Sequence, residues 1–127
     1  MGAAVGVDDG NLKKIYNSVY NGGRTDLYVY FIKKADEICK KGGIISYIIS
    51  NKWMTANYGK KLRIYLSSKQ IDKLIDFGDL PIFEAVTYPS ILIIKNNEAL
   101  VKTQKTQCLD ASLIIKNLMS DLNEAIN

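Results

Sequence analysis

The chain has 127 residues, 47% hydrophobic and 24% charged, which is enough for one domain with its own core and too short for two. Its 17 basic and 13 acidic residues give a net charge of +4, which mildly favours an anionic partner without separating nucleic acid from a membrane surface. The sequence has no histidine, which excludes His-based catalysis and His metal sites, and its two cysteines lack the CxxC spacing of zinc sites and disulfide scaffolds.

No part of the sequence indicates a membrane protein. Its uninterrupted apolar stretches are shorter than ten residues, whereas a bilayer span needs roughly 20, and the start lacks the basic and apolar segments of a signal peptide. We therefore expect no membrane partner and a reducing, cytoplasmic location.

The first two helices are predicted from spacing and caps. Residues 1–10 have no periodic pattern and are expected to be a flexible or expression-derived start. A short helix is then predicted over residues 11–20, before Asn21-Gly22-Gly23, because apolar residues recur at helical spacing: Leu12, Ile15, Tyr16 and Val19.

Asp26 is a candidate N-cap for a longer helix that extends to about Lys41, where Gly42 would end it. Its predicted apolar face consists of Leu27, Phe31, Ala35 and Ile38. Its polar residues are expected mostly on the opposite face: Lys33, Lys34, Asp36, Glu37 and Lys40. Cys39 lies beside the apolar face, and core packing is the favoured interpretation for it rather than reactivity.

A strand, a helix and a strand follow. Residues 43–50 (GIISYIIS) are apolar on both alternating faces, which is typical of a parallel strand covered on both sides. Residues 60–68 predict a helix with Leu62, Tyr65 and Leu66 on one side, and residues 71–77 predict the next strand. This order implies a right-handed crossover and a parallel pair of strands. Residues 90–95 (SILIIK) then return antiparallel, so we expect a mixed α/β sheet.

The loop over residues 79–89 is longer than a common hairpin connection of two to five residues, and loops of this kind often carry binding residues. It leaves the same sheet edge as residues 51–59, and the start of the helix at Asp26 lies on that edge too. We therefore expect four aromatic residues to gather there: Trp53, Tyr58, Phe83 and Tyr88.

Basic residues are concentrated between Asn51 and Lys69, a segment without an acidic residue. They are Lys52, Lys60, Lys61, Arg63 and Lys69. Basic residues interleaved with aromatic ones are typical of phosphate contacts combined with base stacking. The alternative is a solvated helix face beside an aromatic core edge, and spacing alone favours this alternative.

Beyond Asn96 the sequence turns polar, and residues 99–127 are expected to be a connector followed by an amphipathic helix capped by Asp110. The predicted apolar side of that helix consists of Ile114, Leu118, Leu122, Ala125 and Ile126. We expect this side to fold back onto the sheet or to pair with a second copy as a homodimer.

Residues 24–94 resemble the catalytic domain of N6-adenine DNA methyltransferases, especially the large, type IIG-like methylases of restriction-modification and phage-defence systems. Three blocks carry the resemblance, namely DLYVYFIKKA, GGIISYIISNKWM and FGDLPIFEAVTYPSILII. Ser50 departs from the pattern, since relatives often have proline before the Asn-Lys-Trp step.

The resemblance implies a partial Rossmann-like methyltransferase sheet, with two parallel strands plus a reversed last strand, flanked by helices. Such enzymes bind S-adenosylmethionine through a glycine-containing loop and hold the adenine amino group with an Asn-Pro-Pro-Tyr motif, and the sequence contains neither. We therefore expect residues 11–98 to be the C-terminal half of a methyltransferase domain, inactive alone and without a cofactor of its own. The implied partners are DNA, the rest of the methyltransferase and a target-recognition domain.

The resemblance also implies roles for individual residues. Phe83 matches the aromatic residue that stacks on the flipped-out adenine, with Thr87 and Tyr88 beside it, and Asp26 and Tyr30 match the border of the pocket. The expected DNA-binding residues are Lys52, Trp53, Lys60, Lys61 and Arg63. Two alternatives stay open, since Asp26 is also a plain N-cap and Trp53 a plug in the core.

No catalytic residue and no metal ligand is expected in this segment. The competing function is a noncatalytic α/β module that binds nucleic acid or another protein. In that case the resemblance records ancestry, and the basic edge binds the partner.

Overall fold

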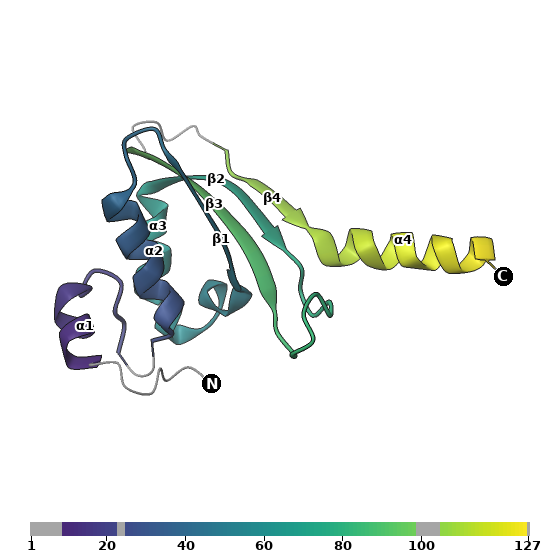
Figure 1. The fold of residues 1–127 in the computed structure, drawn as a ribbon, viewed down its shortest axis with the longest axis horizontal. Coiled ribbons are helices and arrows are strands. Elements are labelled where there is room, and N and C mark those ends of the chain that lie inside the picture. Colours follow the sequence, from purple (N-terminus) through teal and green to yellow (C-terminus); the bar gives the residue numbers. More distant parts are fainter. Residues whose placement is uncertain (1–8, 23–24, 99–104, 127) are drawn as a thin grey trace.

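A computed structural model describes residues 9–22, 25–98 and 105–126, which form a mixed four-stranded sheet with helices packed on one face (Figure 1). The strands are β1 (Ile44–Ser50), β2 (Lys69–Asp76), β3 (Pro89–Glu98) and β4 (Gln107–Asp110). The α-helices are α1 (Asp9–Ile15), α2 (Leu27–Ile38), α3 (Lys60–Ser67) and α4 (Ala111–Ile126), and two short 3-10 helices, Asn51–Met54 and Asn57–Gly59, precede α3. The predicted α/β class is confirmed.

The strand order is β1-β3-β2-β4, with β3 antiparallel to both β1 and β2. Two parallel strands and a reversed one are therefore confirmed, but the expectation that β1 and β2 pair directly is wrong, because β3 lies between them. Leu92 and Ile94 of β3 are almost completely buried, so the most apolar strand takes the centre of the sheet. The parallel neighbour of β2 is β4, a short strand that the polar composition of the connector concealed.

One face of the sheet is covered by α2 and α3, and among the described residues no helix covers the other, which we call the open face (Figure 1). Alternating residues of β1, such as Ile45 and Ile49, are buried in the core, whereas Ile48 is 50% exposed. The prediction that residues 43–50 are covered on both sides is therefore wrong. On the open face the strand register aligns one aliphatic row across all four strands, formed by Ile48, Ile91, Ile75 and Leu109.

Helix α2 begins as predicted, because the Asp26 carboxylate accepts a hydrogen bond from Leu27 N at 2.8 Å. It ends at Ile38 rather than near Lys41. The predicted apolar face is right for Leu27 and Ala35, which pack against the core, and wrong for Phe31 and Ile38, which are exposed. The fully buried residues of α2 are Val29, Tyr30 and Ile32. The first half of α2 is apolar almost all round, so contact with the sheet chooses the buried face. The favoured reading of Cys39 is confirmed, because it packs against the core.

A polar cluster joins α2, α3 and β2, and it includes Lys33 and Asp36 from the predicted polar face of α2. The Asp36 side chain is 8% exposed, accepts a hydrogen bond from the Tyr65 hydroxyl and pairs with Lys69 Nζ at 2.9 Å. Lys33 and Lys69 Nζ lie 4.9 and 5.3 Å from the centre of the Tyr65 ring. Burial alone would raise the pKa of Asp36, but the hydrogen bonds from Lys69 and Tyr65 and the nearby positive charges lower it below its usual value.

The two ends of the chain differ from the predictions in part. Helix α1 begins at Asp9, so an unstructured segment is wrong for Asp9 and Gly10, while residues 1–8 lie outside the described residues. The expected helix stops at Ile15, which is exposed, although Val19 is buried.

Helix α4 is formed as predicted, and the Asp110 carboxylate accepts a hydrogen bond from Ser112 N at 3.0 Å. It projects away from the sheet (Figure 1), so it does not fold back onto it. Its apolar residues Ile114, Leu122 and Ile126 are exposed. Pairing with a second copy stays a prediction.

Candidate nucleic-acid interface

Strands β1 and β2 end at the same edge of the sheet, as predicted, and each is followed by a candidate segment. Residues 51–59 follow β1 directly, and Ser50 supports their first turn because its hydroxyl accepts a hydrogen bond from Lys52 N at 3.2 Å. Serine thus performs a local capping role at the position where the resemblance leads to an expected proline. Residues 77–88 connect β2 to β3.

The base of the second loop is closed by hydrogen bonds, and we call this set of contacts the neck. Phe77 N donates to Pro89 O at 3.1 Å, and Asn51 N donates to Tyr88 O at 2.7 Å. The Asp76 Oδ1 atom accepts from Asn51 Nδ2 at 3.0 Å and from Gly78 N at 2.9 Å. Sequence reasoning missed Asn51 and Asp76, although both are hydrogen-bonding residues at the carboxyl ends of strands, where functional side chains often lie.

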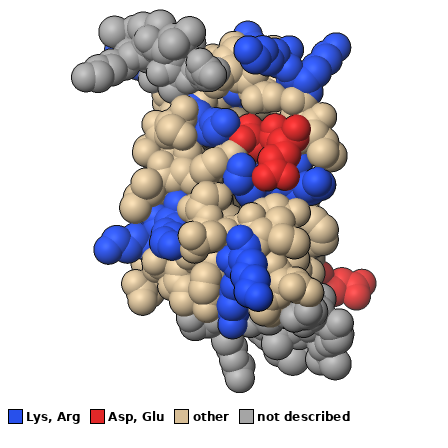
Figure 2. Space-filling view, turned by 90° about the vertical axis from the view of Figure 1, so that its left-hand side faces the viewer, with Lys and Arg blue, Asp and Glu red and all other residues tan. Residues whose placement is uncertain are grey.

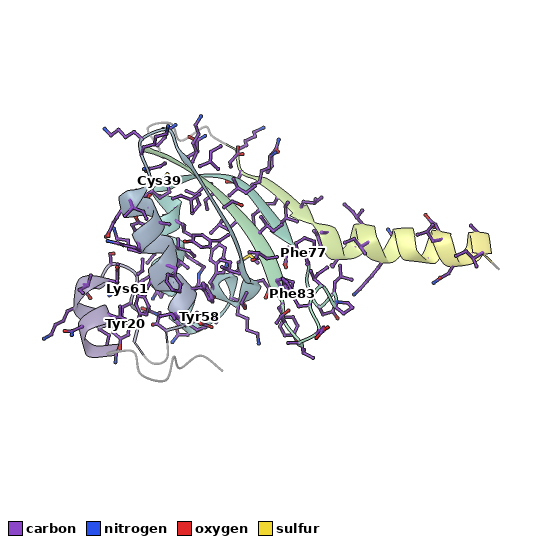
Figure 3. The ribbon with its side chains drawn as sticks, in the orientation of Figure 1. Tyr20, Cys39, Tyr58, Lys61, Phe77 and Phe83 are labelled. Carbon is purple, nitrogen blue, oxygen red and sulfur yellow. The ribbon has the colours of Figure 1, made fainter. Side chains whose placement is uncertain are left out.

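The tip of this loop is the exposed part. Leu80 anchors it in the protein, whereas Phe83 is 48% exposed and Val86 is almost fully exposed. Residues 79–81 and 83–87 line a hollow of about 100 Å³, which places Phe83 and Thr87 around the same space. Figure 3 shows Phe83 near the end of the sheet, on the side away from α1 and α2.

Tyr88 faces a different neighbour, because Lys52 Nζ lies 4.9 Å from the centre of its ring. This distance is within the range of a cation–π interaction. A basic residue after β1 and an aromatic residue before β3 are therefore brought together. Both side chains are exposed.

The other two aromatic residues lie apart from this loop. Trp53 is 5% exposed and belongs to the hydrophobic core, which agrees with the interpretation as a core plug. Tyr58 lies by α2, on the other side of the sheet from Phe83 (Figure 3). The four predicted aromatic residues therefore do not form one cluster.

Tyr58 instead pairs with Tyr28 of α2, with 2.7 Å between the hydroxyl oxygens. Burial and the hydrogen bond with Tyr58 raise the pKa of Tyr28 well above its ordinary value. Burial also raises the pKa of Tyr58, and the charge of Asp26 adds to that effect, whereas the hydrogen bond with Tyr28 opposes it. Both phenols therefore stay protonated near neutral pH. The nearby Tyr30 is buried, with 5% of its surface exposed.

The five basic residues of this region divide into two groups. Arg63 Nη1 donates to Trp53 O at 2.7 Å and to Ala56 O at 2.9 Å, and Lys69 pairs with Asp36, so both hold the fold together. Lys52 and Lys60 are exposed, and Lys61 is partly exposed with its Nζ 3.2 Å from Asn17 O. Figure 2 shows that Lys and Arg are spread over the helix-covered side, while acidic residues there gather mainly in one patch.

Among the described residues there is neither a candidate metal site nor a helix that could cross a membrane. They contain no group of three or more acidic, Cys or His residues that could hold a metal ion. Within the same ranges, every helix falls short of the length and apolarity needed to cross a membrane.

Residues 5–83 match the family of Eco57I restriction-modification methylases. The chain is 36% identical over 87 residues to the Type II restriction enzyme and methyltransferase RM.Eco57I of Escherichia coli, which covers 68% of this chain and 8% of that protein. It is 33% identical to the Type II methyltransferase M.BstVI of Geobacillus stearothermophilus, over 65% of this chain and 15% of the relative. It is 26% identical to the Type II methyltransferase M.XhoI of Xanthomonas vasicola, over 81% of this chain and 19% of the relative.

A solved structure supports the fold. A protein from Listeria monocytogenes described as a class I S-adenosylmethionine-dependent methyltransferase superposes on this chain with a TM-score of 0.59 at 20% identity. The superposition covers 88% of this chain and 36% of that one. At this identity the likeness concerns the fold alone. The chain spans less than a fifth of the length of the three curated relatives.

Proposed function

Because this chain belongs to the Eco57I restriction-modification methylase family, we propose that it forms the target-base and DNA-facing edge of a DNA methyltransferase that modifies the N6 amino group of adenine. The observation that carries the proposal is the loop between β2 and β3. Its base is held by hydrogen bonds, and its tip presents a half-exposed Phe83 beside Thr87. A large apolar side chain on a supported loop is suited to stack on a base.

The proposed chemistry requires an adenine outside the duplex, because its amino group is inaccessible in the stack. Phe83 would stack on the extruded base, with Thr87 and Tyr88 beside it. Asp26 and Tyr30 would border the pocket at the start of α2. Tyr30 is buried, which favours a packing role, whereas Asp26 is partly exposed and lies nearer the surface.

The methyl group would be supplied by S-adenosylmethionine. The hollow of about 100 Å³ in the loop is smaller than the roughly 300 to 1,000 Å³ of usual ligand pockets, so it does not fit this cofactor. We expect the cofactor to be held by other parts of the enzyme, and the isolated chain not to bind it.

Contacts to the DNA backbone would come from Lys52, Lys60 and Lys61, whose side chains are exposed or partly exposed. Arg63 and Trp53 are part of the same proposed surface, but the donation of Arg63 to backbone carbonyls and the burial of Trp53 favour supporting roles. The remaining partners are the rest of the methyltransferase and a target-recognition domain. In the open aliphatic row, Ile48 and Leu109 are exposed and Ile91 and Ile75 are partly exposed, which supports a covering partner, since contiguous apolar surface can mark an interface.

The test compares Phe83→Ala and Phe83→Trp in the methyltransferase that carries this chain. Since Phe83 is 48% exposed, truncation should cost only about 1 kcal/mol of stability, half the usual value for a fully buried side chain. Loss of stacking should cost about 1 to 3 kcal/mol in holding the base. We expect near-native melting, altered fluorescence of 2-aminopurine at the target position, and methylation impaired far more by Ala than by Trp.

Ile82→Ala is the matched control, because Ile82 is the neighbouring residue and is 42% exposed. It should leave 2-aminopurine fluorescence and methylation close to wild type. A large drop in melting temperature for Phe83→Ala, with unchanged fluorescence and turnover in the folded fraction, would make Phe83 a core residue and remove the proposed stacking site.

A further inference from the structure

The neck of the loop contains one hydrogen bond between two side chains, Asp76 at the end of β2 and Asn51 directly after β1, and these two strands do not pair with each other. β1 and β2 are separated by β3, and Ser90 of β3 is the register partner of both Ile49 and Asp76. Asn51 comes two residues after Ile49, and its side-chain amide reaches past the start of β3 to donate to Asp76 Oδ1 at 3.0 Å. The same oxygen accepts from Gly78 N at 2.9 Å, so one carboxylate joins the end of β1 to the first residues of the loop.

The other limb of the loop depends on the same residue. Asn51 N donates to Tyr88 O at 2.7 Å, and the adjacent Lys52 lies over the Tyr88 ring. Asn51 thus contacts the end of the loop, at Tyr88, through its backbone N–H, and the start of the loop, at Gly78, through Asp76. We call these two ends of the loop its limbs. The side chains of Asn51 and Asp76 are both partly buried, where a hydrogen bond to a carboxylate is stronger than in water.

We propose that Asn51 and Asp76 are positioning residues, whose hydrogen bond sets the separation of the two limbs and thereby holds Phe83 and Tyr88 in place. The inference rests on the proposed function, because these two aromatic residues are its target-base site. Asn51 and Asp76 touch neither base nor cofactor in this role. Their effect on turnover is transmitted through the loop.

The experiment exchanges the two side chains in the methyltransferase that carries this chain. Asn51→Asp alone places two carboxylates about 3 Å apart, without a donor between them. The double variant Asn51→Asp with Asp76→Asn restores one donor and one acceptor between the two side chains and leaves the net charge unchanged. Because the single atom Asp76 Oδ1 accepts from both Asn51 Nδ2 and Gly78 N, the exchange recovers the link between the two side chains but not the contact with Gly78 N. Asp76→Asn alone retains an acceptor oxygen and should be mild.

Three measurements are made on each variant: amide hydrogen exchange of residues 77–88, 2-aminopurine fluorescence at the target base, and the separate values of kcat and KM for DNA. For Asn51→Asp we expect faster exchange in the loop and a fall in kcat of about ten- to a hundredfold, the range that corresponds to a lost hydrogen bond to a charged group. KM should change little, because the basic residues are untouched. The double variant should recover part of kcat and of the slow exchange, and should exceed Asn51→Asp in both.

Asp72→Asn is the control, because Asp72 lies on the same strand with an exposed side chain, and it should match wild type in every readout. Wild-type exchange and kcat in Asn51→Asp, or a double variant no better than Asn51→Asp, would overturn the inference. A wild-type enzyme that neither methylates adenine nor alters 2-aminopurine fluorescence would instead overturn the proposed function, while the exchange data would still test the hydrogen bond.

Discussion

Replacing Asp36 with Asn should destabilise the protein much more than a carboxylate change at the surface of the same helix. The Asp36 carboxylate is 8% exposed and joins three elements, since it accepts from Tyr65 of α3 and pairs with Lys69 of β2 at 2.9 Å. A lost hydrogen bond to a charged group costs about 1.5 to 3 kcal/mol. Lys69 is 22% exposed and would lose its partner, so we expect a total of about 2 to 3 kcal/mol, or a fall in Tm of roughly 10 °C.

The assay is urea unfolding followed by the fluorescence of Trp53, the single tryptophan of the chain, which lies in the core against which α2 packs. Glu37→Gln is the control, because Glu37 is 39% exposed and forms surface pairs with Lys33 and Lys34 at 3.2 and 3.8 Å. Surface pairs contribute about 0 to 1 kcal/mol, so this variant should unfold almost as wild type does.

The contribution of Asp36 should also depend on pH with a defined sign. Its pKa in the folded protein is lowered below the usual 3.8, because hydrogen bonds from Lys69 and Tyr65 outweigh the effect of burial. The stabilisation is therefore fully present above about pH 3.8 and is lost as the pH falls through the lower folded pKa. The difference in unfolding free energy between wild type and Asp36→Asn should be constant near neutral pH and shrink in acid. An Asp36→Asn cost no larger than that of Glu37→Gln, or a difference that persists in strong acid, would refute this reasoning.

Two further predictions concern the loop and the basic edge. Gly78→Ala should lower the Tm more than Gly42→Ala. Both positions have positive φ (58° and 75°), so each variant carries about 1 to 2 kcal/mol of backbone strain, but an added Cβ at Gly78 would also lie 3.1 Å from Ser112 Cβ, whereas Gly42 faces open space. Equal melting of the two variants would show that the Ser112 contact has no effect. The double variant Lys60→Gln with Lys61→Gln in the methyltransferase should weaken binding to all DNA sequences and flatten its salt dependence by up to about one unit of slope per lost phosphate contact. The exposed control pair, Lys40→Gln with Lys41→Gln, should leave both the affinity and the slope unchanged. Arg63→Gln should lower the Tm and leave that slope unchanged, and an equal slope for the two lysine pairs would show that the 60–61 surface is merely solvated.

The sequence by itself determined the features that depend on neighbours along the chain. The caps at Asp26 and Asp110 were predictable, because capping joins a side chain to a backbone N–H one to three residues away. Strands β1, β2 and β3 and helix α3 were also found at nearly their observed bounds, since β-branched runs and helical spacing are local signals. The order of strand, helix and strand predicted the directions of these strands, and the family resemblance added the roles expected for the residues of the exposed loop.

Only the tertiary structure decided which surfaces meet. Nothing local distinguishes Phe31 from Ile32 in an apolar segment, and the sheet buries Ile32 and leaves Phe31 exposed. Likewise, the sequence predicts Arg63 to be a free surface cation, whereas in the structure it donates hydrogen bonds to the carbonyl oxygens of Trp53 and Ala56. Asn51 and Asp76 are 25 residues apart, and they meet because β3 enters between β1 and β2 and brings both strand ends to one edge. Contacts across such distances depend on the order of the strands, which no local pattern encodes.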